Sequence, residues 1–171
     1  MENLAATVAD LFTSAIALEN AAEALYRQLA EMFAGHPEVA AFWKHYADEE
    51  KGHGAYLARI RDGVPERRLA APADANMMRN ARKCLHDISQ APIGHIANLE
   101  QAYQLAVELE NSETNTIFEF VIVNFSTDEL AKSHKFLRAQ LHNHIAKLEE
   151  AFPQGYRDSF RRREVLVKSE K

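Results

Sequence analysis

Glycine and proline are scarce in this chain, and their scarcity restricts its possible folds more than any other feature. The 171 residues contain six glycines and five prolines, gathered at a few places that leave long stretches of helix-forming residues between them. Apolar residues in these stretches recur at intervals of three and four, as on one face of an α-helix. No alternating strand pattern of any length occurs, so the sequence predicts an all-α protein.

Four long helices are expected, as two hairpins joined by a crossover that contains a shorter helix. Their expected spans are residues 2–34, Pro37 to the RDGVP segment, Pro92 through an apolar stripe ending at Phe120, and Ser126 to Pro153. The linker covers residues 62–73, and the shorter helix covers residues 74–90 with Asp74 as its cap. Two hairpins with a long helical crossover indicate a four-helix bundle. We expect residues 1–150 to form one bundle domain and residues 151–171 to form a basic tail.

Composition excludes several classes of function. A net charge of −5 argues against a general nucleic-acid binder or a binder of anionic membranes. Cys84 is the single cysteine, which excludes a disulfide framework and a cysteine-rich metal site. The first residues do not resemble a signal peptide, and no run of apolar residues reaches the length of a membrane span, so a cytoplasmic protein is expected.

An internal repeat indicates where a functional site would lie. At an offset of 91 residues, LENAAE (18–23) falls on LENSET (109–114), and His53 falls on His144. Glu19 and His53 each lie 17 residues from the turn at His36, so they face each other across the first hairpin, and Glu110 and His144 do the same across the second. Glu50 shares a helix face with His53, and Glu113 shares one with Glu110.

The repeat therefore places six ionisable side chains at one level of the core: Glu19, Glu50, His53, Glu110, Glu113 and His144. Such groups are costly to bury unless something neutralises them, and a pair of divalent cations would do so. Carboxylate and imidazole ligands without thiolates suit Fe, Mn or Zn. The alternative interpretations are solvated charge pairs at the glutamates and a hydrogen-bonded core histidine at position 144. Tyr26 faces the same side as Glu19 and could hydrogen-bond a ligand carboxylate.

The segment AIALENAAEALYRQLA, followed by YADEEKGH, resembles the first hairpin of the rubrerythrins, which belong to the ferritin-like di-iron carboxylate proteins. The resemblance covers residues 2–150 and implies a ferritin-like four-helix bundle with two iron ions. It also implies that the six residues above are the ligands, that the substrate is peroxide or oxygen, and that the chain forms a homodimer or a higher oligomer. The two Cys-x-x-Cys pairs of a rubredoxin module are missing, so a separate electron donor is expected.

One position departs from the pattern of that family. Leu141 stands where the fourth helix of a rubrerythrin carries a glutamate that helps to bridge the two metals. Two hypotheses follow. The chain is either a di-iron peroxidase or ferroxidase, or a degenerate bundle that binds one metal such as Zn for a structural, sensing or interaction role.

Overall fold

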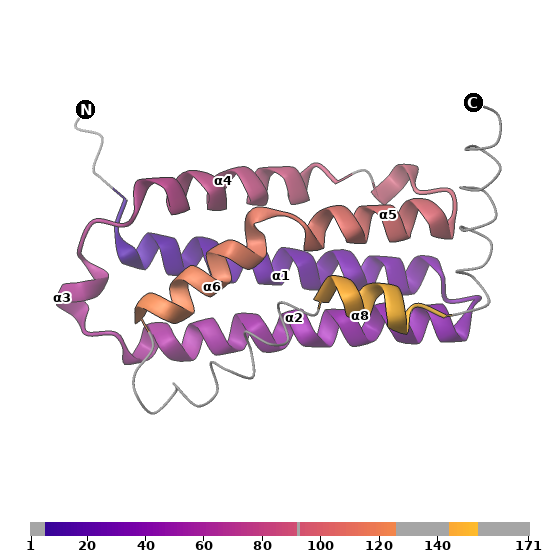
Figure 1. Ribbon diagram of the computed structural model, residues 1–171, viewed down its shortest axis with the longest axis horizontal. Coiled ribbons are helices and arrows are strands. Elements are labelled where there is room, and N and C mark those ends of the chain that lie inside the picture. Colours follow the sequence, from indigo (N-terminus) through magenta and orange to yellow (C-terminus); the bar gives the residue numbers. More distant parts are fainter. Residues whose placement is uncertain (1–5, 92, 126–143, 154–171) are drawn as a thin grey trace.

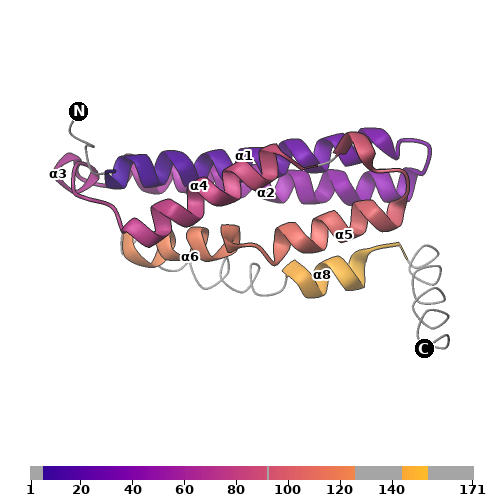
Figure 2. The same ribbon diagram turned by 90° about the horizontal axis from the view of Figure 1, so that it is seen from above.

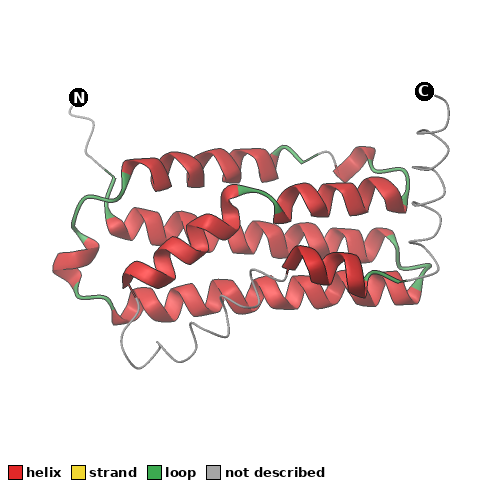
Figure 3. Ribbon diagram, viewed as in Figure 1, coloured by secondary structure: helices red, strands yellow, loops and turns green. Residues whose placement is uncertain are grey.

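The computed structural model describes residues 6–91, 93–125 and 144–153, and it has no strand in these ranges, as predicted. The helices are α1 (Val8–Met32), α2 (Pro37–Gly63), α3 (Glu66–Leu69), α4 (Ala75–Ser89), the 3₁₀ turn η1 (Ile93–His95), α5 (Leu99–Glu110), α6 (Glu113–Phe125) and α8 (His144–Ala151). Figure 3 shows loops between α1 and α2, between α2 and α3, between α3 and α4, and between α5 and α6.

The first hairpin consists of α1 and α2, which run antiparallel over their whole length (Figure 1). α1 begins later than the expected start near Glu2, because Thr7 and Asp10 form a capping box: the Thr7 hydroxyl accepts the Asp10 N–H, and the Asp10 carboxylate accepts the Thr7 N–H at 2.8 Å. Pro37 is the first residue of α2, as predicted. A backbone N–H at this position has no acceptor within the helix, so the lack of one in proline costs no hydrogen bond.

The crossover after α2 contains the predicted helix. The Asp74 carboxylate accepts the backbone N–H groups of Asn76 and Met77, each at 2.9 Å, and so caps α4. α4 then packs against α1 and α6. The expected linker, residues 62–73, is partly helical, since α2 continues to Gly63 and α3 forms one further turn.

The prediction of an unbroken third helix is wrong. Asn111 and Ser112 interrupt it and divide it into α5 and α6. The Asn111 side-chain amide donates to the Val107 carbonyl at 2.8 Å, while the Ser112 hydroxyl accepts the Thr114 N–H at 3.3 Å. The Ser112 hydroxyl thus binds the Thr114 N–H, which in a continuous helix would donate to the Glu110 carbonyl.

The elements form two layers, which are visible from above in Figure 2. The α1–α2 hairpin makes one layer, and α5, α6 and α8 make the other. Figure 1 shows that α6 slants relative to α5. Lys147 of α8 joins the layers through an ion pair with Glu49 of α2 at 3.2 Å. The expected start of the fourth helix at Ser126–Glu129 lies outside the described residues, and its last turns are α8, which ends two residues before Pro153. No helix in the described part of the chain is long and apolar enough to cross a membrane.

The apolar core consists of two separate clusters. The first cluster packs the N-terminal half of α1 against the C-terminal half of α2, α4 and α6. The second packs the C-terminal half of α1 against the N-terminal half of α2, α5 and α8. On α1 the boundary falls between Leu18 and Ala22, and Glu19 therefore lies between the two clusters.

Candidate metal centre

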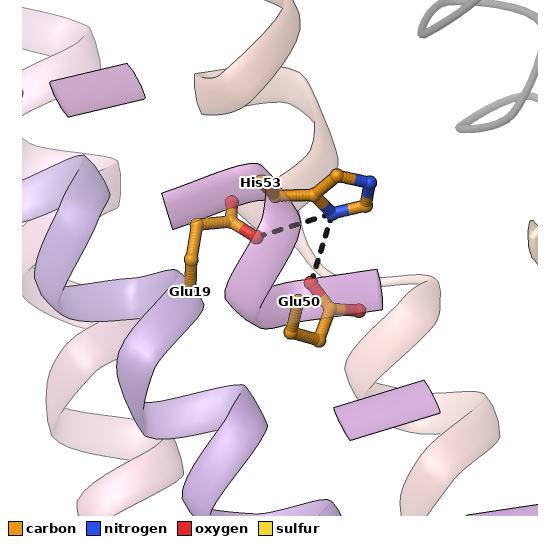
Figure 4. Close-up of side chains that lie close together, drawn as sticks. All are labelled: Glu19, Glu50 and His53. Carbon is orange, nitrogen blue, oxygen red and sulfur yellow. Dashed lines mark hydrogen bonds and ion pairs between the residues drawn. The ribbon is translucent and has the colours of Figure 1, made fainter. Parts of the chain in front are cut away.

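The α1–α2 hairpin brings three ionisable side chains together in the middle of the bundle. Glu19 comes from α1, and Glu50 and His53 come from adjacent turns of α2 (Figure 4). His53 Nδ1 lies 3.0 Å from Glu50 Oε2 and 3.5 Å from Glu19 Oε2. The facing of these residues across the hairpin was predicted from their equal distance to the turn.

The three side chains are almost completely buried. Their residues are 3% exposed at Glu19, 5% at Glu50 and 3% at His53. The His53 ring also packs on Phe118 of α6, with ring centroids 4.9 Å apart, so the second layer closes over the site. A buried cluster with two carboxylates and one imidazole requires bound protons or a cation for neutrality.

The pKa values of the cluster reflect this requirement. Burial raises the pKa of Glu50 to about 8, with a further contribution from Glu19 and against the opposing effect of His53. Burial alone would lower the pKa of His53, but hydrogen bonds with Glu19 and Glu50 outweigh it and raise that pKa to about 10. At neutral pH the cluster therefore holds more protons than the same side chains would hold in water.

A glycine lies between the two helices beside the cluster. A Cβ atom on Gly54 would lie 3.2 Å from Asn20 Oδ1 and 3.5 Å from Glu19 Cβ. The first distance is shorter than an ordinary van der Waals contact. The two helices therefore pass close to each other at the residue that follows His53, and an added methyl group there would require a small shift of the exposed Asn20 amide.

Glu110, the last residue of α5, is the fourth predicted ligand that the structure buries, at 5% exposure. The Tyr26 hydroxyl donates to Glu110 Oε1 at 2.5 Å, which confirms that Tyr26 hydrogen-bonds one of the predicted ligand carboxylates. Burial raises the pKa of Tyr26 well above its usual value, and the nearby charges of Glu110 and Glu50 raise it further, so the phenol keeps its proton. Glu50 and Glu110 both lie near enough to Tyr26 for their charges to raise its pKa. We refer to the buried residues Glu19, Tyr26, Glu50, His53 and Glu110 as the polar layer.

The polar layer is contacted by one residue that the sequence did not suggest. Asn115 of α6 donates from Nδ2 to the Glu110 carbonyl at 2.9 Å, and the same nitrogen lies 3.5 Å from Glu110 Oε2. The only signal for it in the sequence is the cluster of residues NSETN (111–115), whose short polar side chains favour caps over helix interiors.

The other predicted positions do not add to the described site. Glu113 opens α6 and His144 opens α8, but their side chains, like the whole of Leu141, lie outside the part of the structure that is described. Glu23, one turn after Glu19, forms an ion pair with Arg27 at 2.8 Å instead of joining the cluster.

The donor set fits a divalent cation. One ligand atom from each of Glu19, Glu50 and His53 lies within 4.8 Å of the other two, so a single ion between them could contact all three. Oxygen and imidazole donors suit Fe, Mn and Zn. Such an ion would replace the extra protons that the cluster otherwise holds.

A cavity of about 440 Å³ lies apart from this cluster, between α4 and α5. Its walls include Leu25, Cys84, Asn111 and Ser112, but none of the four buried acidic and histidine residues.

Comparison with protein families matches the rubrerythrin family over residues 10–140. Neither the curated proteins nor the solved structures include a match to the chain.

Proposed function

Because this chain belongs to the rubrerythrin family, whose members are di-iron carboxylate proteins, we propose that it is an oxidoreductase that reduces peroxide or oxygen at a metal centre in the bundle core. The observation that carries the proposal is the buried contact of His53 with Glu19 and Glu50. Bound iron would supply the electrons for the reduction.

The chain's own residues would have distinct tasks. Glu50 is the proposed bridging carboxylate, and Glu19 and Glu110 are the proposed terminal carboxylates. His53 and His144 would complete the two metal positions, and Glu113 would be an additional ligand. Tyr26 keeps a proton at its hydroxyl and directs it at Glu110 Oε1. The packing of Phe118 against His53 limits the access of water to the cluster.

The proposal extends to the surroundings of the site. The bundle domain would cover residues 1–150, and the chain would work in the cytoplasm as a homodimer or higher oligomer. Electrons would come from a separate donor protein, because these 171 residues contain one cysteine and cannot themselves form the four-cysteine iron site of a rubredoxin.

A second function is favoured by Leu141, which replaces the bridging carboxylate expected from the fourth helix. With three buried donors on the first hairpin and a leucine on the fourth helix, the protein would bind one metal ion, such as zinc. Its role would then be structural, sensory or that of an interaction module.

Metal content per chain separates the two functions. Elemental analysis would be carried out on protein as purified and again after anaerobic loading with ferrous iron. About two irons per chain, with peroxide consumption, support the oxidoreductase. One metal or fewer, or zinc that iron cannot displace, supports the second function. In that case Leu141→Glu should raise the iron content, and no change would contradict the assignment of this position.

A further inference from the structure

The break between α5 and α6 changes the hydrogen bonding that follows Glu110. In a continuous α-helix this carbonyl would accept the N–H of residue 114. Here the Thr114 N–H is directed to the Ser112 hydroxyl at 3.3 Å. The break therefore falls directly after a proposed metal ligand, so that α6 does not continue the helix that carries this ligand.

Asn115 of α6 forms a hydrogen bond across the break to the Glu110 carbonyl. Its side-chain amide donates to the Glu110 carbonyl at 2.9 Å and lies 3.5 Å from Oε2 of the same residue. An asparagine amide has two hydrogens and can serve both oxygens, whereas alanine or aspartate could serve neither. Tyr26 reaches the other carboxylate oxygen, Oε1, from α1 at 2.5 Å. Glu110 is thus contacted by Asn115 of α6 at its carbonyl and at Oε2, and by Tyr26 of α1 at Oε1.

We infer that Asn115 is a positioning residue, which holds Glu110 across the helix break in the orientation that a metal ion requires. This inference rests on the proposed function, because Glu110 is one of the proposed ligands. A carboxylate held in place before the metal arrives loses less conformational freedom on binding. Residues that orient metal ligands typically change metal affinity by about 10- to 100-fold when they are substituted.

The chain offers a matched control on the same helix. Asn124 also donates its side-chain amide to a backbone carbonyl, that of Phe120 at 2.8 Å, but it is exposed and near the end of α6. Asn115→Ala and Asn124→Ala therefore remove the same kind of hydrogen bond, and only the first removes one at Glu110.

The test is a titration of the full-length apoprotein with Co²⁺, followed by the absorption of the bound ion. Asn115→Ala should weaken Co²⁺ binding by about 10- to 100-fold, and Asn124→Ala should leave it unchanged within about twofold. In a Glu110→Ala background, Asn115→Ala should have no further effect on affinity, because the positioned carboxylate is gone. Wild-type affinity in Asn115→Ala, or an equal loss in both backgrounds, would overturn the inference.

Two further measurements cover the remaining outcomes. If Asn115→Ala does not fold, Asn115→Leu keeps the approximate size of the side chain, removes its donors without adding a charge, and should show the same loss of affinity. If wild-type protein binds no Co²⁺, the proposed function fails, and a crystal structure of apo Asn115→Ala decides the inference by itself. The Glu110 carboxylate should then have left the Tyr26 hydroxyl, and its retention there would refute a positioning role.

Discussion

The hydrogen bond from Tyr26 to Glu110 allows a quantitative test of the polar layer. Tyr26→Phe removes one hydroxyl and leaves the ring, which is stacked on Trp43 with centroids 5.9 Å apart and planes 10° apart. The ring also contacts Tyr46 edge-on at 5.4 Å. The substitution therefore changes hydrogen bonding at Glu110 and very little of the surrounding packing.

The expected loss follows from the burial of both partners. Tyr26 is fully buried and Glu110 is 5% exposed, so water cannot replace the hydroxyl at Oε1. Removing one partner of a buried hydrogen bond to a charged group costs about 2 kcal/mol. For a chain of this size that loss lowers the melting temperature by about 4–8 °C. The apoprotein is the correct material, because a bound metal would compete for the same carboxylate.

Urea unfolding followed by circular dichroism measures the loss directly. The same substitution in a Glu110→Ala background should destabilise the apoprotein by much less, since the acceptor is absent, and the difference gives the coupling between the two side chains. A loss below about 0.5 kcal/mol, or an equal loss in both backgrounds, would show that the 2.5 Å contact does not stabilise the fold.

Three further predictions concern the cluster on the first hairpin. The stability of the apoprotein should decline as the pH rises, because Glu50 and His53 bind their protons more tightly in the folded state than in the unfolded state. The stabilisation from Glu50 is lost between its usual pKa of 4.5 and its folded pKa of about 8. The stabilisation from His53 is lost between 6.5 and about 10. Urea midpoints should therefore fall from pH 6.5 to 10, His53→Gln should lack the decline above pH 8, and a flat wild-type profile would contradict the assignment. Binding of Co²⁺ at neutral pH should release at least one proton, since a ligating imidazole nitrogen is unprotonated; calorimetry in buffers of different ionisation enthalpy would reveal it, and no dependence on the buffer would refute it. In Gly54→Ala the free energy of unfolding should stay the same or rise by up to about 1 kcal/mol, because alanine is the better helix former and the exposed Asn20 can turn away from the new Cβ. A clear loss of thermal stability would mean that Asn20 cannot move.

The first hairpin could be predicted from sequence because the number of residues between a side chain and the turn determines which residue lies opposite it. Two uninterrupted helices around a short turn place residues equally far from that turn opposite each other, and this alone brought Glu19 to His53. The cap of α4 could also be predicted from sequence: the Asp74 carboxylate accepts the backbone N–H groups of Asn76 and Met77, as an N-cap residue should. The family match over residues 10–140 agrees with the resemblance seen in the sequence.

The third helix could not be predicted in the same way. Its apolar stripe continues through Asn111 and Ser112, so periodicity gives no sign of a break. The break depends on side-chain hydrogen bonds such as that from the Thr114 N–H to the Ser112 hydroxyl, whose energies are comparable to those of the backbone bonds that they replace. Asn115 was missed for the same reason, since its partner at Glu110 exists only once the helix has broken.

The division of the core into two apolar clusters bears on how cooperatively the protein unfolds. Ile88 of α4 is the one side chain in the described ranges that packs against both clusters, and between them lie the carboxylates and the imidazole. Each end of the bundle therefore has its own apolar contacts and can open with a free energy below that of global unfolding. A metal ion ligated across α1 and α2 would tie the ends into one unit. Amide hydrogen exchange should show two protection levels along α1 in the apoprotein, changing near Glu19, and a single level once Co²⁺ is bound. One uniform protection level in the apoprotein would instead mean that the two ends of the bundle unfold together even without a bound metal ion.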